Sequence, residues 1–350
     1  MSVCVHRHLL DLVEEGGHWI LTNPGRIQRV AAAFRRDDLT PSIVFFVGQQ
    51  YKVRTLQTLI PDQIESAPQS HGIANLLIAE KSLVTNSPLL YLDCLPGATC
   101  TTLTSAWTIC HDNSRLTLSV SVSSLTDIVA KLHVNLVIPL CHVICVFVDD
   151  FVNVDACRSY VENWLQHVAP GAPSPSAAQP KLMLCTFCLE NMSPLSQIES
   201  HQNFSYVFAG LQIVCLDKPD EIQPIRVVLA KSLQHTRYTR SQSHLLFSLR
   251  HLSSMFNASI SSNLTELDTL KMHQPILDVV QDNRAVAHLQ HALTLYQSRL
   301  DQDRVVDLIA SALLVQCYPR TVHSESCSLS TKGLIADTRQ GLPQTSSSSE

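Results

Sequence analysis

Short, continuously apolar runs recur along the chain up to residue 217, and each is followed by a polar or glycine-containing loop. Continuous rather than alternating apolar positions are typical of parallel strands that are covered on both faces. The runs are SIVFFVG (42–48), LLYLDC (89–94), HVICVFV (142–148), KLMLCTF (181–187) and LQIVCLD (211–217). They predict five strands of a mostly parallel sheet.

Helix-like segments separate several of these runs. YKVRTLQTLI (51–60) follows the first run, SLTDIVAKLHVNLV (124–137) precedes the third, and VDACRSYVENWLQHV (154–168) follows it. Strands that alternate with helices predict βαβ units, and therefore an α/β fold in which helices flank the sheet.

The pattern divides the chain into four parts. An N-terminal helical or loop segment covers residues 1–40, and the α/β domain covers residues 41–224. Beyond it, apolar positions fall at helical spacing, which predicts a helical C-terminal extension over residues 225–322. Residues 323–350 are rich in serine and are typical of a disordered tail.

The composition of the chain argues against nucleic acid as a partner and against a membrane-spanning segment. Charged residues make up only 16% of the chain and the net charge is −5, so clustered basic residues that would neutralise nucleic-acid phosphates are not expected. The N-terminus does not read as a secretory signal, and the longest apolar run is too short to cross a bilayer. We expect a soluble, cytoplasmic protein with no membrane-spanning segment.

A cytoplasmic location predicts that the 12 cysteines are mostly reduced and pack as small hydrophobes. The lone C-x-x-C of CTFC has no second pair at zinc spacing, so no metal site is predicted. We interpret the four glycosylation sequons, at Asn191, Asn203, Asn257 and Asn263, as chance occurrences.

The stretch GQQYKVRT (48–55) has the register of a phosphate-binding loop, G-x-x-x-x-G-K-[ST], directly after a strand. Gly48 fits the first position and Thr55 the last. Val53 occupies the second glycine position of this consensus, where a β-branched residue is disfavoured. Arg54 occupies the lysine position and has a planar guanidinium group instead of an ammonium group. Lys52 lies two residues too early to be assumed as a substitute. We expect a loop that keeps its shape and has lost much of its chemistry.

Two further nucleotide motifs are eroded in the same way. Asp93 ends the second run where a D-x-x-G motif would begin, but Pro96 occupies the glycine position and has no N–H to donate. The fourth run ends CTFCLEN, where a guanine-reading [NT]-K-x-D would lie, and it lacks the carboxylate. Asp149 and Asp150 follow the third strand at the edge where ligands of such sheets bind. Our preferred interpretation of these two is a solvated helix start.

The order of these features resembles the fungal P-loop GTPase-like regions that precede patatin-like phospholipase domains. The resemblance extends from about Thr22 to Arg320 through TNPGRIQRVAAAFRR, the loop at 48–55, SHGIANLLIAEKS, LLYLDCLPG, HVICVFVDDFVNVDACRSYVENWL and LLFSLRHLSSMFNASI. It implies a P-loop NTPase-like fold. The glycine-rich oxyanion turn and the G-x-S-x-G elbow of a patatin domain are not found, so lipid hydrolysis is not expected.

Three hypotheses follow for function. The first is a non-catalytic pseudo-GTPase that binds protein partners, with no catalytic residue and no cofactor. The second is a weak GTP- or ATP-binding or hydrolysing protein, in which Gly48, Arg54, Thr55 and Asp93 would hold phosphate and Mg²⁺. The third is a fragment of a patatin-like phospholipase polypeptide without its hydrolase domain. The erosion of three separate motifs favours the first.

Overall fold

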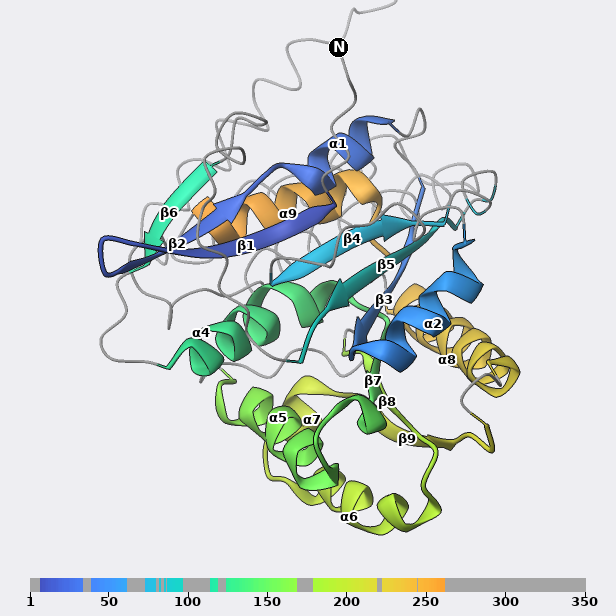
Figure 1. The fold of residues 1–350 in the computed structure, drawn as a ribbon. Helices are drawn as coiled ribbons and strands as arrows, with labels where there is room; N and C mark the ends of the chain where they lie inside the picture. Colours follow the sequence, from blue (N-terminus) through green and yellow to red (C-terminus); the bar gives the residue numbers. More distant parts are fainter. Residues whose placement is uncertain are drawn as a thin grey trace, which may run out of the picture. The chain divides into compact units, whose positions relative to one another are not determined.

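The computed structural model describes residues 7–33, 39–61, 73–79, 82, 85, 87–96, 114–118, 124–168, 179–218, 222–243 and 245–261 (Figure 1). The predicted helices beyond residue 261 and the predicted serine-rich tail lie outside these residues. Within them, no helix is long and apolar enough to cross a membrane.

The five strands predicted from the apolar runs are confirmed, and all of them pair in parallel. They lie in the order β5-β3-β7-β8-β9. Their bounds are β3 Ser42–Val47, β5 Leu89–Cys94, β7 Val143–Phe147, β8 Lys181–Thr186 and β9 Gly210–Cys215. Every residue of β3 and β7 is buried, as a strand covered on both faces requires.

The sheet continues past β5 with four strands that pair antiparallel, so it is mixed and not mostly parallel as predicted. The full order in the described residues is β6-β2-β1-β4-β5-β3-β7-β8-β9. The added strands are β4 Ala74–Ile78, β1 His8–Glu15, β2 His18–Asn23 and β6 Ser114–Leu118. Their pairings all join neighbouring strands in opposite directions.

The prediction of helix or loop over residues 1–40 is therefore wrong for β1 and β2. A two-residue turn joins them, and both of its residues, Gly16 and Gly17, have positive φ angles of 60° and 79°. Glycine adopts this conformation without a steric penalty, and such turns suit the twist of a hairpin. The helical part of this segment is limited to α1, Arg26–Ala33.

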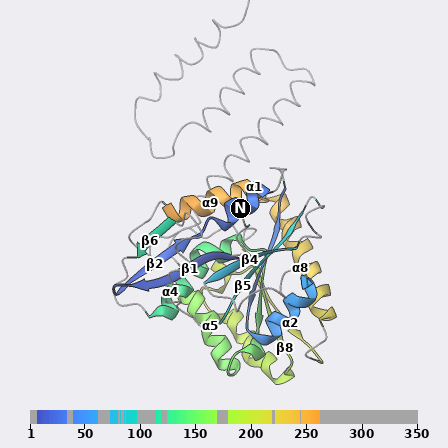
Figure 2. The same ribbon diagram turned by 45° about the horizontal axis from the view of Figure 1, so that its top comes forward.

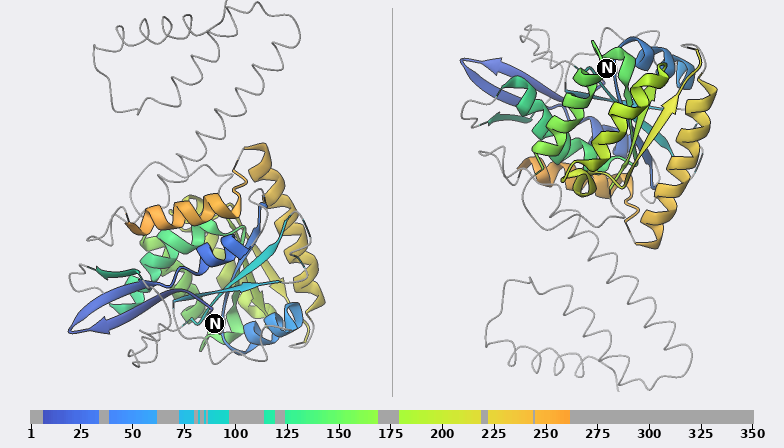
Figure 3. Two further views of the ribbon diagram at one scale, coloured as in Figure 1. Left: turned by 90° about the horizontal axis from the view of Figure 1, so that it is seen from above. Right: turned by 90° about the horizontal axis from the view of Figure 1, so that it is seen from below.

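Helices cover both faces of the parallel strands (Figure 3). On one face, α2 Gln50–Leu59 and α8 Gln223–Gln242 bury apolar side chains against Phe46 and its neighbours. On the other face, α4 Leu125–Leu132 continues into a π-helical turn at His133–Val137, and α5 Val154–Gln166 follows β7. Phe45, which alternates with Phe46, lies against the ring of Trp164 of α5. The helices predicted at 51–60, 124–137 and 154–168 are confirmed.

The boundary predicted at residue 224 does not separate two packing units. Leu229 of α8 belongs to the same core cluster as Phe46. Arg237 of α8 donates a hydrogen bond of 2.8 Å to the carbonyl oxygen of Thr40, just before β3. The helix α9, Leu249–Ser261, packs beside α1 over the antiparallel strands (Figure 2). The helical character predicted for residues after 224 is confirmed for α8 and α9.

Candidate functional site

The candidate residues lie at the carboxyl edge of the parallel strands. The chain leaves β3 through α2 and returns to β5 on one side of β3, whereas β7 lies on its other side. In open α/β sheets, ligands bind outside the carboxyl ends of the strands where the order reverses in this way. Gly48 follows β3, Asp93 lies near the end of β5, and Asp150 follows β7 in a short 3₁₀ turn, Val148–Asp150.

The expected phosphate-binding loop is not present at this position. Only Gly48 and Gln49 separate β3 from α2, which begins at Gln50. The N–H of Val53 donates a helical hydrogen bond of 3.0 Å to the carbonyl oxygen of Gln49. The prediction that the loop keeps its shape is therefore wrong. A valine at the second glycine position is readily accommodated in a helix, but not in a backbone conformation that requires glycine.

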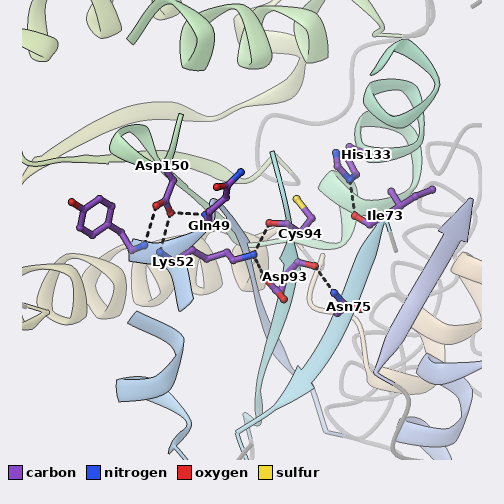
Figure 4. Close-up of polar contacts among 9 residues, drawn as sticks. Gln49, Lys52, Ile73, Asn75, Asp93, Cys94, His133 and Asp150 are labelled. Carbon is purple, nitrogen blue, oxygen red and sulfur yellow. Dashed lines mark hydrogen bonds and ion pairs between the residues drawn. The ribbon is translucent and has the colours of Figure 1, made fainter. Parts of the chain in front are cut away.

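The carboxylate of Asp150 occupies the N-terminus of α2 (Figure 4). It accepts hydrogen bonds from the backbone N–H groups of Gln49 at 2.6 Å, Tyr51 at 3.0 Å and Lys52 at 3.1 Å. The first N–H groups of a helix have no partner within the helix and attract anions, so a phosphate bound here would use the same donors. Asp150 supplies that negative charge from the protein itself.

The close approach of Asp150 also accounts for Gly48. A Cβ atom at Gly48 would lie 2.5 Å from the Asp150 Oδ2 atom and 3.0 Å from the Cβ atoms of Lys52 and Phe147. Any side chain at this position would therefore displace the carboxylate or the helix. The glycine predicted to wrap a phosphate instead makes room for an internal carboxylate.

Lys52, which sequence reasoning set aside, is the buried cation of the site. Its side chain is fully buried, its Nζ atom lies 2.5 Å from Asp93 Oδ1, and it donates a hydrogen bond of 2.8 Å to the carbonyl oxygen of Cys94 (Figure 4). Lys52 precedes the buried Leu56 by four residues, and side chains at this spacing share one helix face. That spacing was the sequence signal that would have placed Lys52 on the inner face of α2.

Arg54 and Thr55, the other two predicted residues, make contacts with their own helix. The Thr55 hydroxyl donates a hydrogen bond of 2.9 Å to the carbonyl oxygen of Tyr51. Arg54 is exposed and its guanidinium carbon lies 5.8 Å from the centre of the Tyr51 ring. The structure thus brings Gly48 and Asp93 into the network through Asp150 and Lys52, whereas Arg54 and Thr55 contact Tyr51 of their own helix.

At the end of β8, where a guanine-reading motif would lie, Phe187 packs against Tyr51 of α2. The Phe187 ring lies 4.5 Å from the Tyr51 ring, centre to centre. The N–H of Phe187 donates a hydrogen bond of 2.8 Å to Asp149 Oδ2, which ties the end of β8 to the end of β7. Asp149 and Asp150 both accept backbone hydrogen bonds, so their interpretation as a solvated helix start is wrong. The following helix starts at Val154, and Asn153 caps it.

The cysteines near this edge behave as packing residues. Among the described residues the cysteines are free, and burial raises the pKa values of the Cys94 and Cys185 thiols to about 12. Protonated thiols are poor nucleophiles and poor metal ligands. In the part of the chain that the structure describes, no group of three or more His, Cys, Asp or Glu residues could hold a metal ion.

Two of the sequons are also engaged in internal contacts. The side-chain amide of Asn191 donates to the Thr186 hydroxyl at 3.1 Å, and that of Asn203 donates to the carbonyl oxygen of Leu165 at 2.9 Å. A glycan would replace one of the two hydrogens on the amide nitrogen and leave a single N–H for this bond. Asn257 accepts hydrogen bonds from Asn23 and Gln28, and Asn263 lies outside the described residues.

Replacing Asp150 by alanine should lower the free energy of unfolding by about 2 kcal/mol, because three backbone donors lose a charged acceptor. Urea denaturation measures this loss. Added sulfate should raise the stability of the variant more than that of the wild type, because sulfate stabilises folded proteins in general and the freed helix N-terminus of the variant also attracts an anion. Equal stability of the two proteins would show that the carboxylate does not hold α2.

Neither the scan against protein-family models nor the search of curated proteins found a match to this chain. The function therefore has to be inferred from the geometry of the site.

Proposed function

We propose that this chain is a non-catalytic GTPase-like module that acts by binding protein partners. The observation that carries the proposal is the Asp150 carboxylate, which takes the three backbone donors at the start of α2. Those donors are the groups that a phosphate would need at a strand–helix junction of this kind.

The arrangement of the parallel strands supports the GTPase-like part of the proposal. The first strand of the set, β3, lies inside the sheet, with β5 on one side and β7, β8 and β9 on the other. The strand–turn–helix unit of residues 42–59 leads away from this inner strand. An inner first strand followed by a helix is also a feature of doubly wound α/β domains, many of which receive nucleotides at the carboxyl edge of the sheet.

The charges at the junction support the non-catalytic part. Asp150 places a negative charge where the phosphate charge would lie. A phosphate that approached this carboxylate would be repelled strongly, because both groups are negatively charged. The positive charge of Lys52 is already paired with Asp93 at 2.5 Å. A nucleotide would have to displace the Asp150 carboxylate and break the ion pair between Lys52 and Asp93. The Thr55 hydroxyl would also have to give up its hydrogen bond to the Tyr51 carbonyl oxygen.

Calorimetric titration with GTP, ATP and their diphosphates in the presence of Mg²⁺ tests this proposal. We expect no binding heat and no shift of the melting temperature at millimolar nucleotide. The matched variant carries Val53→Gly and Arg54→Lys, which restore the two missing loop residues. Because both positions lie inside α2, the variant should also fail to bind.

Micromolar binding by the wild type would overturn the proposal and revive a weak nucleotide-binding protein. Binding by the double variant alone would show that nucleotide binding was lost through Val53 and Arg54 and not through Asp150.

A further inference from the structure

We infer that the carboxyl edge of the sheet is a docking surface for a partner segment that combines apolar side chains with lysine or arginine. This surface, here called the edge patch, consists of Val152, Leu189 and Met192 together with the Tyr51–Phe187 ring pair. The inference rests on the proposed function, because it requires that no nucleotide fills the same edge.

Hydrogen bonds and a ring contact join the chain segments that carry the edge patch. The N–H of Tyr51 of α2 donates to Asp150, two residues before Val152. The N–H of Phe187 donates to Asp149, and Phe187 lies two residues before Leu189. The Tyr51 and Phe187 rings touch, with their centres 4.5 Å apart. The segments that follow β3, β7 and β8 therefore lie together at this edge of the sheet.

The exposure of these side chains is unusual for the described part of the molecule. Val152 is 96% exposed and Leu189 is 70% exposed, and Met192 is also exposed. The other large exposed hydrophobic side chains among the described residues are Val53, Tyr206, Val227 and Tyr238, which lie on α2, on α7, Phe204–Val207, and on α8. Apolar side chains that gather in one exposed place mark interaction sites more often than isolated ones do.

The charges around the edge patch define the chemistry of the partner. Asp149, Asp150, Asp155 and Glu190 lie within three residues of Val152 or Leu189 in the chain. The guanidinium carbon of Arg54 lies 5.8 Å from the centre of the Tyr51 ring. Asp155 and Glu190 are exposed, and Asp149 and Asp150 are partly exposed. The excess of carboxylates favours a partner with basic residues next to its apolar ones, because complementary potentials speed and orient association. An amphipathic basic segment meets both requirements.

Fluorescence anisotropy tests the inference with two designed amphipathic helices as probes. One is built from leucine and lysine, and in the other glutamate replaces every lysine. The lysine probe should bind at least about tenfold more tightly than the glutamate probe, and its affinity should fall with rising salt. Val152→Ser with Leu189→Ser should weaken binding of the lysine probe by about tenfold.

Matched control variants distinguish binding at the edge patch from non-specific hydrophobic binding. Val227→Ser with Tyr238→Ser removes two exposed apolar side chains of α8 and should leave affinity unchanged. Glu190→Lys should weaken binding, whereas Glu199→Lys, at an exposed position in another turn, should not. All four positions tested for apolar contact are exposed, so the variants should fold as the wild type does.

The outcomes separate the two proposals. Equal affinity for both probes, no binding of either, or an equal loss in the α8 control would overturn the docking inference. Nucleotide titration of the same preparations tests the proposed function independently. Absence of both probe and nucleotide binding would overturn the docking surface and leave the proposed lack of nucleotide binding standing.

Discussion

Replacing Asp93 by alanine should lower the free energy of unfolding by about 3–5 kcal/mol, because it leaves a buried cation without its partner. Lys52 is fully buried and its Nζ atom lies 2.5 Å from the Asp93 carboxylate. The remaining hydrogen bond to the Cys94 carbonyl does not neutralise the charge. Urea denaturation at neutral pH measures the loss.

The double variant Lys52→Met with Asp93→Ala is the matched control. Methionine fills the buried volume of the lysine stem without a charge, so the double variant should recover more than half of the lost stability. A small loss in the single variant would show that Lys52 reaches solvent and that the site is open. A working nucleotide site predicts the opposite pattern, in which Asp93→Ala impairs ligand binding and costs little stability.

The protein should lose about 3 kcal/mol of stability between neutral pH and pH 4 through His133 alone. Burial lowers the pKa of His133 to about 4 from an ordinary value of 6.5. The ring is fully buried, packs against Phe45 and Trp164, and shares a hydrogen bond of 3.1 Å with the Ile73 carbonyl through Nε2. The folded protein therefore holds His133 neutral, whereas the unfolded chain takes up a proton below about pH 6.5.

The sign of the effect follows from this difference. The contribution is complete above pH 6.5, decreases as the pH falls, and is lost near pH 4. His142 acts in the same direction, because burial, and then the charges of Arg240 and Arg237, hold its pKa well below the ordinary value.

Denaturation at several pH values measures the slope, and His133→Phe should reduce it. An unchanged slope in His133→Phe would show that His133 is not the group that takes up the proton.

The sequence predicted the central part of the fold well. The five parallel strands and three of the helices could be predicted because continuous apolar runs and helical spacing are local signals. The antiparallel strands β1, β2, β4 and β6 were not predicted, since the sequence of a short strand does not indicate the strand with which it pairs. The Gly16–Gly17 pair is a local sequence signal of the turn that joins β1 and β2.

By itself, the sequence determined that Gly48 and Asp93 lie at the carboxyl edge of one sheet and that Val53 and Arg54 depart from the phosphate-binding consensus. Only the tertiary structure decided which residues contact these positions. Asp150 reaches the start of α2 across about a hundred residues of chain, and Asp93 reaches Lys52 from a neighbouring strand. Such contacts depend on strand order and on the side chain that each strand end presents. A lysine or an aspartate in a local motif therefore has no fixed partner until the sheet is assembled.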